Sequence, residues 1–222
     1  MKNIKKHRLI LINGLFLIIP LSLMLGNLFS NLNIILLCFA AFILYFEKII
    51  KFQVNFFDKI ILIFFIFTFI VLIINFLESY SNNEIFPKII INKTFWYFRY
   101  FILYLVLRVL IGQKILRLDW FSLSCAICAT FVCFDIFVQY FFGKDIFGIA
   151  QVGSRHYSAV FGKELIAGGY LQKFSLFVFF LPFVLKKNLS YKILIQIIVF
   201  IIFFIGIILS GNRMPLILFI FS

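Results

Sequence analysis

The chain has few charged residues, and most of those it has are basic. Only 13% of its 222 residues are charged, and 21 Lys and Arg stand against 8 Asp and Glu, whereas 64% of the residues are hydrophobic. A soluble domain carries roughly a quarter charged residues, so this composition excludes a water-facing surface over most of the chain. The net charge of +13 does not indicate nucleic-acid binding, because the basic residues lie between apolar runs rather than on one face. Lipid is therefore the expected solvent.

Residues that bind metals or serve as nucleophiles are also scarce. The chain has two histidines, and its four cysteines, Cys38, Cys125, Cys128 and Cys133, all lie inside apolar runs. Cys125 and Cys128 form a CxxC pair, but without further ligands or a βαβ context they are interpreted as packing residues. The few acidic residues form no DxD pair of the kind that holds a metal with a sugar diphosphate. We therefore expect neither a metal nor a cofactor.

Long apolar runs are what the chain has in abundance. A helix needs roughly 20 apolar residues to cross about 30 Å of hydrocarbon, and no alternating pattern indicates a barrel. The predicted fold is all-α, a polytopic transmembrane helix bundle in which residues 1–222 form a single integral-membrane domain. The predicted spans are residues 9–29, 32–50, 59–77, 94–112, 120–142, 165–185 and 190–209. Few residues follow Met214, so we expect only the start of an eighth helix and a C-terminally truncated chain, the N-terminal part of a longer protein.

The basic residues also predict how the spans are oriented. Most of the Lys and Arg lie in the N-terminal segment and in the loops that follow the second, fourth and sixth spans. Loops of this kind face the cytoplasm under the positive-inside rule. No small-residue cleavage site follows the first apolar run, so the N-terminus is expected to stay cytoplasmic on an uncleaved first span. Residues 143–172, a loop and the start of the next helix, then face outward.

Two arginines are the strongest binding candidates in the outward region. Arg155 lies in the loop, and Arg213 follows the small and polar residues 210–212 at a predicted helix start. A guanidinium group binds phosphate oxygens through two parallel hydrogen bonds, so two outward arginines at a membrane surface can clamp a lipid diphosphate. Headgroup contact or snorkelling is the alternative interpretation of each arginine alone.

Two further ionisable residues fall within predicted spans. Lys173 lies below the membrane surface if the sixth span includes residues 165–173; it then either belongs to a site or snorkels outward. Asp135 lies well inside the fifth span, where an unpaired carboxylate is costly. It therefore needs a partner, for which Arg155, Lys173 and Arg213 are candidates. The pairing is either structural or orients an arginine that binds substrate.

Several of these residues together resemble a known family. The pattern covers residues 135–215 and is similar to the central region of the O-antigen ligase and O-antigen polymerase superfamily. Its most specific element is the SG-x-R run that precedes a helix. The positions that carry the resemblance are Asp135, Gln139, Tyr140, Gly143, Asp145, Gly148, Arg155, Phe161, Gly162, Glu164, Gly168, Gly169, Tyr170, Leu171, Ser210, Gly211, Asn212 and Arg213.

The resemblance implies a multi-pass glycosyltransferase of the bacterial inner membrane. Such an enzyme takes a glycan from an undecaprenyl-diphosphate carrier on the periplasmic face and transfers it to lipid A core, to another glycan or to a protein. Ligase and polymerase are not separated by these residues. The arginines that engage the diphosphate in the family correspond by motif to Arg155 and Arg213. The family's catalytic histidine is expected further along the chain, so His156 is not given that role and the catalytic residue is unknown.

A polytopic transporter or a flippase for lipid-linked oligosaccharides is the alternative class. Such a protein also has many helices with charges inside the membrane, but it is expected to show an inverted repeat and a charged central cavity. The two halves of this sequence show no convincing repeat, and the charged candidates gather toward one predicted face. The enzyme interpretation is therefore preferred.

Reporter fusions test the predicted orientation. Alkaline phosphatase fused after Gly148 is expected to be active, and green fluorescent protein fused at the same point is expected to be dark. The reason is that the basic loops, at the opposite ends of the spans, face the cytoplasm. Fusions after Lys51 are the matched control and are expected to give the opposite pair of signals. A cytosolic Gly148 would contradict both the orientation and the outward site.

Overall fold

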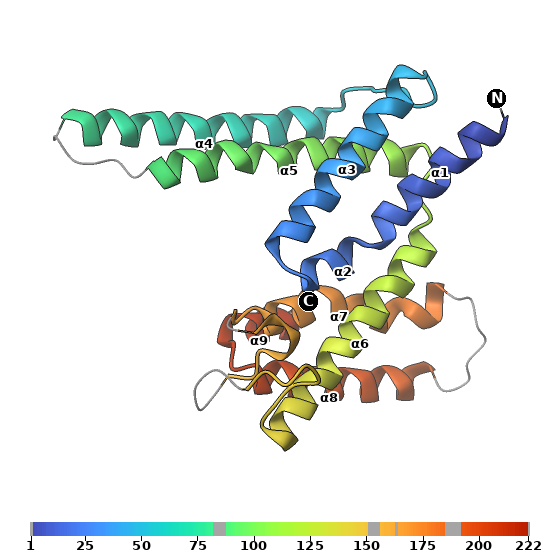
Figure 1. The fold of residues 1–222 in the computed structure, drawn as a ribbon, viewed down its shortest axis with the longest axis vertical. Helices are drawn as coiled ribbons and strands as arrows, with labels where there is room; N and C mark the ends of the chain where they lie inside the picture. Colours follow the sequence, from blue (N-terminus) through green and yellow to red (C-terminus); the bar gives the residue numbers. More distant parts are fainter. Residues whose placement is uncertain (1, 82–87, 151–155, 163, 185–191, 222) are drawn as a thin grey trace. The chain divides into compact units, whose positions relative to one another are not determined.

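The computed structural model describes residues 2–81, 88–150, 156–162, 164–184 and 192–221, and in these residues the chain is helical without a β-strand. The predicted all-α class is confirmed for this part of the chain. The elements, drawn in Figure 1, are α1 Lys2–Leu17, α2 Ile19–Met24, α3 Asn27–Phe46, α4 Phe56–Ser81, α5 Lys88–Gly112, α6 Leu118–Phe142, the 3-10 turn η1 Ala159–Phe161, α7 Ala167–Val184, α8 Lys192–Leu209 and α9 Arg213–Ile220.

Three of the described helices are long and apolar enough to cross a membrane. They are α3, the segment Phe56–Glu78 of α4, and α6, and shorter apolar helices cover His7–Leu17, Ala167–Leu181 and Ile193–Leu209. The protein is accordingly a membrane protein. The count of about seven spans is not confirmed, and it stays a prediction together with the orientation.

The predicted first span, residues 9–29, is divided in two. Helix α1 ends at Leu17 and α2 begins at Ile19, with Pro20 in the first turn of α2. Proline has no N–H group for the helical ladder, and its ring clashes with the preceding turn. The apolar run is therefore continuous in sequence but forms two helices.

The chain divides into two units, each of which packs mainly on itself. Unit 1 contains Met1–Ile12 and Ile34–Leu116, and unit 2 contains Asn13–Asn33 and Arg117–Ser222. The single integral-membrane domain over residues 1–222 stays a prediction.

In unit 1, α4 and α5 lie side by side (Figure 1) and are joined by a buried polar cluster at one end. Asp58, in the first turn of α4, is 3% exposed. Its carboxylate accepts hydrogen bonds from the Asn55 N–H at 2.7 Å and the Tyr104 hydroxyl at 3.2 Å, and it pairs with the Arg108 guanidinium at 2.8 Å. Arg108 also donates to the Gln53 carbonyl at 2.5 Å. The buried acid is thus neutralised within the unit.

In unit 2, α2, α7 and α8 pack against α6, and α9 packs against α7 and α8. The small residues Ala129 and Cys133 of α6 are buried. Helix α8 approaches especially closely at Gly206, where an added Cβ would lie 2.9 Å from the Cys133 sulfur. Without a hydrophobic driving force between helices in lipid, small residues of this kind permit the tight packing that holds them together.

Replacement of Arg108 tests the buried pair of unit 1. Arg108→Ala is expected to lower the free energy of unfolding by roughly 3–5 kcal/mol, because it leaves the Asp58 carboxylate buried without a cation. Arg8→Ala removes the exposed ion pair with Glu47 and is expected to cost about 0–1 kcal/mol. Far-UV circular dichroism during SDS titration in mixed micelles measures both. Equal losses in the two variants would contradict the importance of the buried pair.

Candidate functional site

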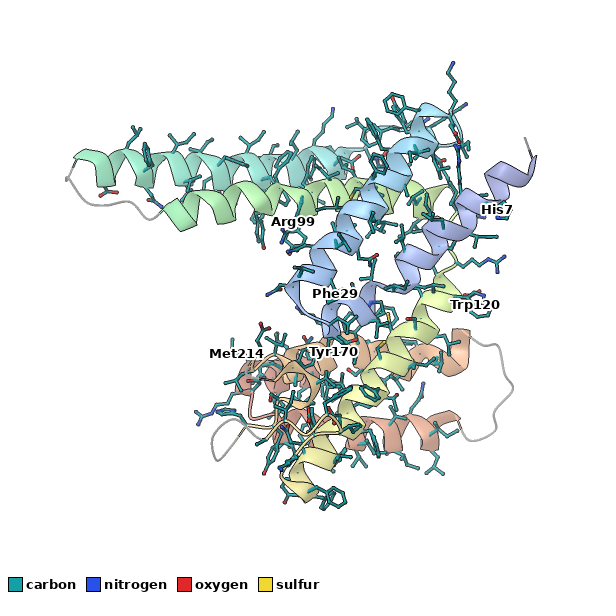
Figure 2. All side chains as sticks on the ribbon, in the orientation of Figure 1. His7, Phe29, Arg99, Trp120, Tyr170 and Met214 are labelled. Carbon is teal, nitrogen blue, oxygen red and sulfur yellow. The ribbon has the colours of Figure 1, made fainter. Side chains whose placement is uncertain are left out.

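A pocket of about 540 Å³ lies in unit 2, among the α2–α3 turn, the first turns of α7 and the turn that joins α8 to α9. Tyr170 and Met214, both labelled in Figure 2, belong to its wall. The pocket is lined by Leu23, Gly26, Asn27, Ser30, Phe161, Leu165, Ile166, Gly169, Tyr170, Lys173, Phe174, Asn212, Arg213, Met214 and Pro215. Two of the predicted binding residues, Lys173 and Arg213, therefore line one cavity.

The α8–α9 turn brings Arg213 to the pocket. Gly211 takes the left-handed conformation at φ +74°, which ends α8, and its N–H donates to the Ile208 carbonyl at 3.0 Å. Asn212 is extended, and its side-chain amide donates to the Leu165 carbonyl at 2.8 Å instead of capping α9. This bond fastens the turn to the segment that precedes α7. Arg213 then begins α9.

Gly168, the first of the two glycines that precede Tyr170, lets α7 meet this turn. A Cβ added at Gly168 would overlap the Ser210 hydroxyl and lie 3.0 Å from the Asn212 Cβ. Ser210 itself is 2% exposed, and its hydroxyl donates to the Ile207 carbonyl at 2.7 Å, so it has little room to move. The Gly-Gly motif and the SG-x-R motif, about 40 residues apart in sequence, are therefore in direct contact through their small residues.

The charge distribution of the pocket favours an anion. None of the lining residues is acidic, and the two charged ones, Lys173 and Arg213, are both cations and both exposed. The N-terminus of α9 has no side-chain cap, and the first N–H groups of a helix have no partner within the helix. A cation at the positive end of a helix dipole is unfavourable by itself. An anion in the pocket would satisfy the side chains and the helix terminus together.

Tyr170 shapes the wall of the pocket beside the cations. Its ring stacks at a tilt on Phe174, with centroids 4.5 Å apart, and its hydroxyl donates to the Pro20 carbonyl at 2.9 Å. The hydroxyl thus joins α7 to α2 and keeps the ring in place. The polar atom is satisfied, so the ring presents an apolar surface to the cavity.

Asp135 binds backbone in unit 2, and its predicted partner Arg155 lies outside the described residues. Asp135 is fully buried in α6, and its Oδ1 accepts a hydrogen bond from the Ile146 N–H at 2.8 Å. In the described residues no ion pair joins it to Lys173 or Arg213, and its Oδ2 has no hydrogen-bond partner of good geometry. Asp135 therefore holds the backbone of the loop that follows α6 rather than contacting either of those two cations.

Gln139 also holds the segment that follows α6. It was not selected from the sequence as a site residue. It lies one turn after Asp135, is fully buried, and accepts a hydrogen bond from the Ala159 N–H at 2.9 Å while donating to the Ile149 carbonyl at 3.3 Å. The spacing of four residues, which places both side chains on one face of α6, is the signal that could have identified it. Two buried polar side chains thus tie residues 143–150 and η1 to the helix.

Arg155 lies outside the described residues, so its predicted convergence with Arg213 stays a prediction. His156 is half-buried, and its Nδ1 atom is buried without a hydrogen-bond partner among the described residues.

No family model, no curated protein and no solved structure matches this chain.

Two substitutions at Asp135 test its anchoring role. Asp135→Ala is expected to lower the free energy of unfolding by about 1–3 kcal/mol, because the part-buried hydrogen bond from the Ile146 N–H loses its acceptor. Asp135→Asn keeps an acceptor oxygen and is expected to cost less. Thr130→Ala is the control on the same helix, since that hydroxyl donates only to the Ala126 carbonyl of its own helix, at 2.8 Å.

The comparison is measured by SDS titration and by hydrogen exchange at the Ile146 amide, which should lose protection in Asp135→Ala and keep it in Asp135→Asn. An Asn variant as unstable as the Ala variant would show that the charge matters and would favour an ion pair.

Proposed function

We propose that this protein is a glycosyltransferase of the O-antigen ligase or polymerase type in the bacterial inner membrane. Its donor would be a glycan on an undecaprenyl-diphosphate carrier at the periplasmic face. The observation that carries the proposal is the shared pocket of Lys173 and Arg213, which has no acidic lining residue and includes an uncapped helix start. The resemblance of residues 135–215 to that superfamily points to the same ligand.

The proposed chemistry is displacement at the sugar carbon that bears the diphosphate. A hydroxyl group of the acceptor forms the new glycosidic bond, its proton leaves to a base, and the bond to the diphosphate oxygen breaks. Negative charge then grows on the departing diphosphate, and cations already placed there stabilise it without reorganisation. Lys173 and Arg213 are suited to this role. No base is assigned among the described residues.

The two cations would contribute in different ways. Arg213 presents a planar set of donors that can hold two phosphate oxygens at once, whereas Lys173 acts as a mobile point charge. Arg155 is proposed as a further contact from the family pattern alone. Asp135 would act indirectly, because its bond to Ile146 positions the loop that leads to Arg155. The acceptor, whether lipid A core, glycan or protein, is left open by these residues.

Binding of geranylgeranyl diphosphate to the purified chain in nanodiscs tests the pocket. Arg213→Ala is expected to weaken binding about tenfold to a hundredfold, because a hydrogen bond to a charged group contributes roughly 1.5–3 kcal/mol. Arg213→Lys should fall between the wild type and Arg213→Ala, because it keeps the charge and loses the paired hydrogen bonds. Arg117→Ala, the same change of charge at the start of α6 and outside the pocket lining, is the matched control.

Transfer of glycan in membranes from cells that produce the protein is the second readout. Unchanged transfer and binding in Arg213→Ala would remove that residue from the mechanism. Movement of a fluorescent polyprenyl-diphosphate lipid across proteoliposomes, without transfer, would instead indicate the flippase class.

A further inference from the structure

A second, nearly apolar groove lies in unit 1, between α3 and α5. Its walls come from α3 between Cys38 and Tyr45 and from α5 between Ile102 and Val109, on both helices at the i, i+3, i+4, i+7 spacing of one face. The groove has a volume of about 310 Å³, and its only polar side-chain atoms are the Cys38 thiol and the Tyr45 hydroxyl. The site proposed above does not use it.

One end of the groove is closed by the loop between α3 and α4. Ile50 and Phe52 of this loop line the groove, and the loop is held to the end of α5 by two hydrogen bonds. The Gln113 amide donates to the Lys51 carbonyl at 2.6 Å, and Arg108, whose guanidinium also lies 5.7 Å from the centre of the Phe52 ring, donates to the Gln53 carbonyl at 2.5 Å. These two hydrogen bonds fix the backbone of the loop at the closed end of the groove.

The same end carries cations that no acid of the described residues neutralises. The loop and its neighbours hold four exposed lysines: Lys48, Lys51, Lys59 and Lys114. The two acids of these segments, Glu47 and Asp58, are already paired with Arg8 and Arg108. An apolar groove is therefore bordered by unbalanced positive charge at its closed end.

We propose that this groove binds one anionic phospholipid, with an acyl chain between α3 and α5 and the headgroup phosphate at Lys51 and Lys114. The two parts of the site match the two parts of such a lipid. A hydrocarbon chain needs no polar partner and gains from an apolar wall, whereas an anionic headgroup is attracted to lysines near the membrane surface. A helix of another protein would fill the groove but would leave the lysines unbalanced.

Quenching of tryptophan by brominated acyl chains tests the proposal. The chain is placed in vesicles of phosphatidylcholine that contain a small fraction of either brominated phosphatidylglycerol or brominated phosphatidylcholine, with Trp96 and Trp120 replaced by Phe. Phe42→Trp places the probe in the groove, and Phe67→Trp on α4 is the control, because the two side chains have similar exposed fractions of 54% and 60%. Val106→Trp on the facing wall is a second probe that does not depend on Phe42.

The groove probes are expected to be quenched at least about threefold more strongly by the phosphatidylglycerol than by the phosphatidylcholine, and the control equally by both. Lys51→Gln with Lys114→Gln should remove the preference, while Lys144→Gln in unit 2 should keep it. Equal quenching of a groove probe by both lipids, or a preference that survives the double lysine change, would overturn the proposal. Complete protection of both groove probes would also overturn it and would indicate a protein occupant.

Discussion

Two buried polar side chains on one face of α6 hold the irregular part of unit 2 in place. Asp135 and Gln139 bind the backbone of the segment that follows the helix, at Ile146, Ile149 and Ala159. Both side chains are fully buried, so water competes poorly for these bonds, and they help to fix the course of the segment. The chain then enters α7 at a defined point, which is what allows Gly168 to meet the α8–α9 turn. The pocket of unit 2 depends on all of these contacts.

Some basic residues neutralise an acid, and others have no acidic partner among the described residues. Arg108 pairs with Asp58 of α4 and contacts Gln53 and Phe52 of the α3–α4 loop, and it is therefore a structural cation. Lys173 and Arg213 have no acidic partner among the described residues, although they line one cavity. Leaving two cations near each other without an acid has an electrostatic cost, and an anionic ligand is the simplest way to offset it.

The cavity of unit 2 and the groove of unit 1 are both lined mainly by apolar residues and bordered by cations, and they differ in the side chains that supply the charge. In unit 2 the arginine is presented by a turn that is fastened through Asn212 to Leu165 and limited by Gly168. In unit 1, Lys51 lies in a loop whose backbone is held by the Gln113 amide, and Lys114 follows Gln113 in sequence. A planar guanidinium suits paired hydrogen bonds to one phosphate group, whereas the ammonium groups of lysines attract a headgroup as point charges.

The amino-acid sequence by itself determined that the protein is helical and belongs in a membrane, because composition and the length of apolar runs are local properties. It also marked Lys173 and Arg213, since a cation beside an apolar run is visible without a fold. The tertiary structure decided that these two share a pocket, that Asp135 binds backbone rather than pairing with either of them, and that Gln139 belongs with it. Those outcomes depend on which segments meet after α6. Lys173 and Arg213 are about 40 positions apart in sequence, so they come together only because helices pack.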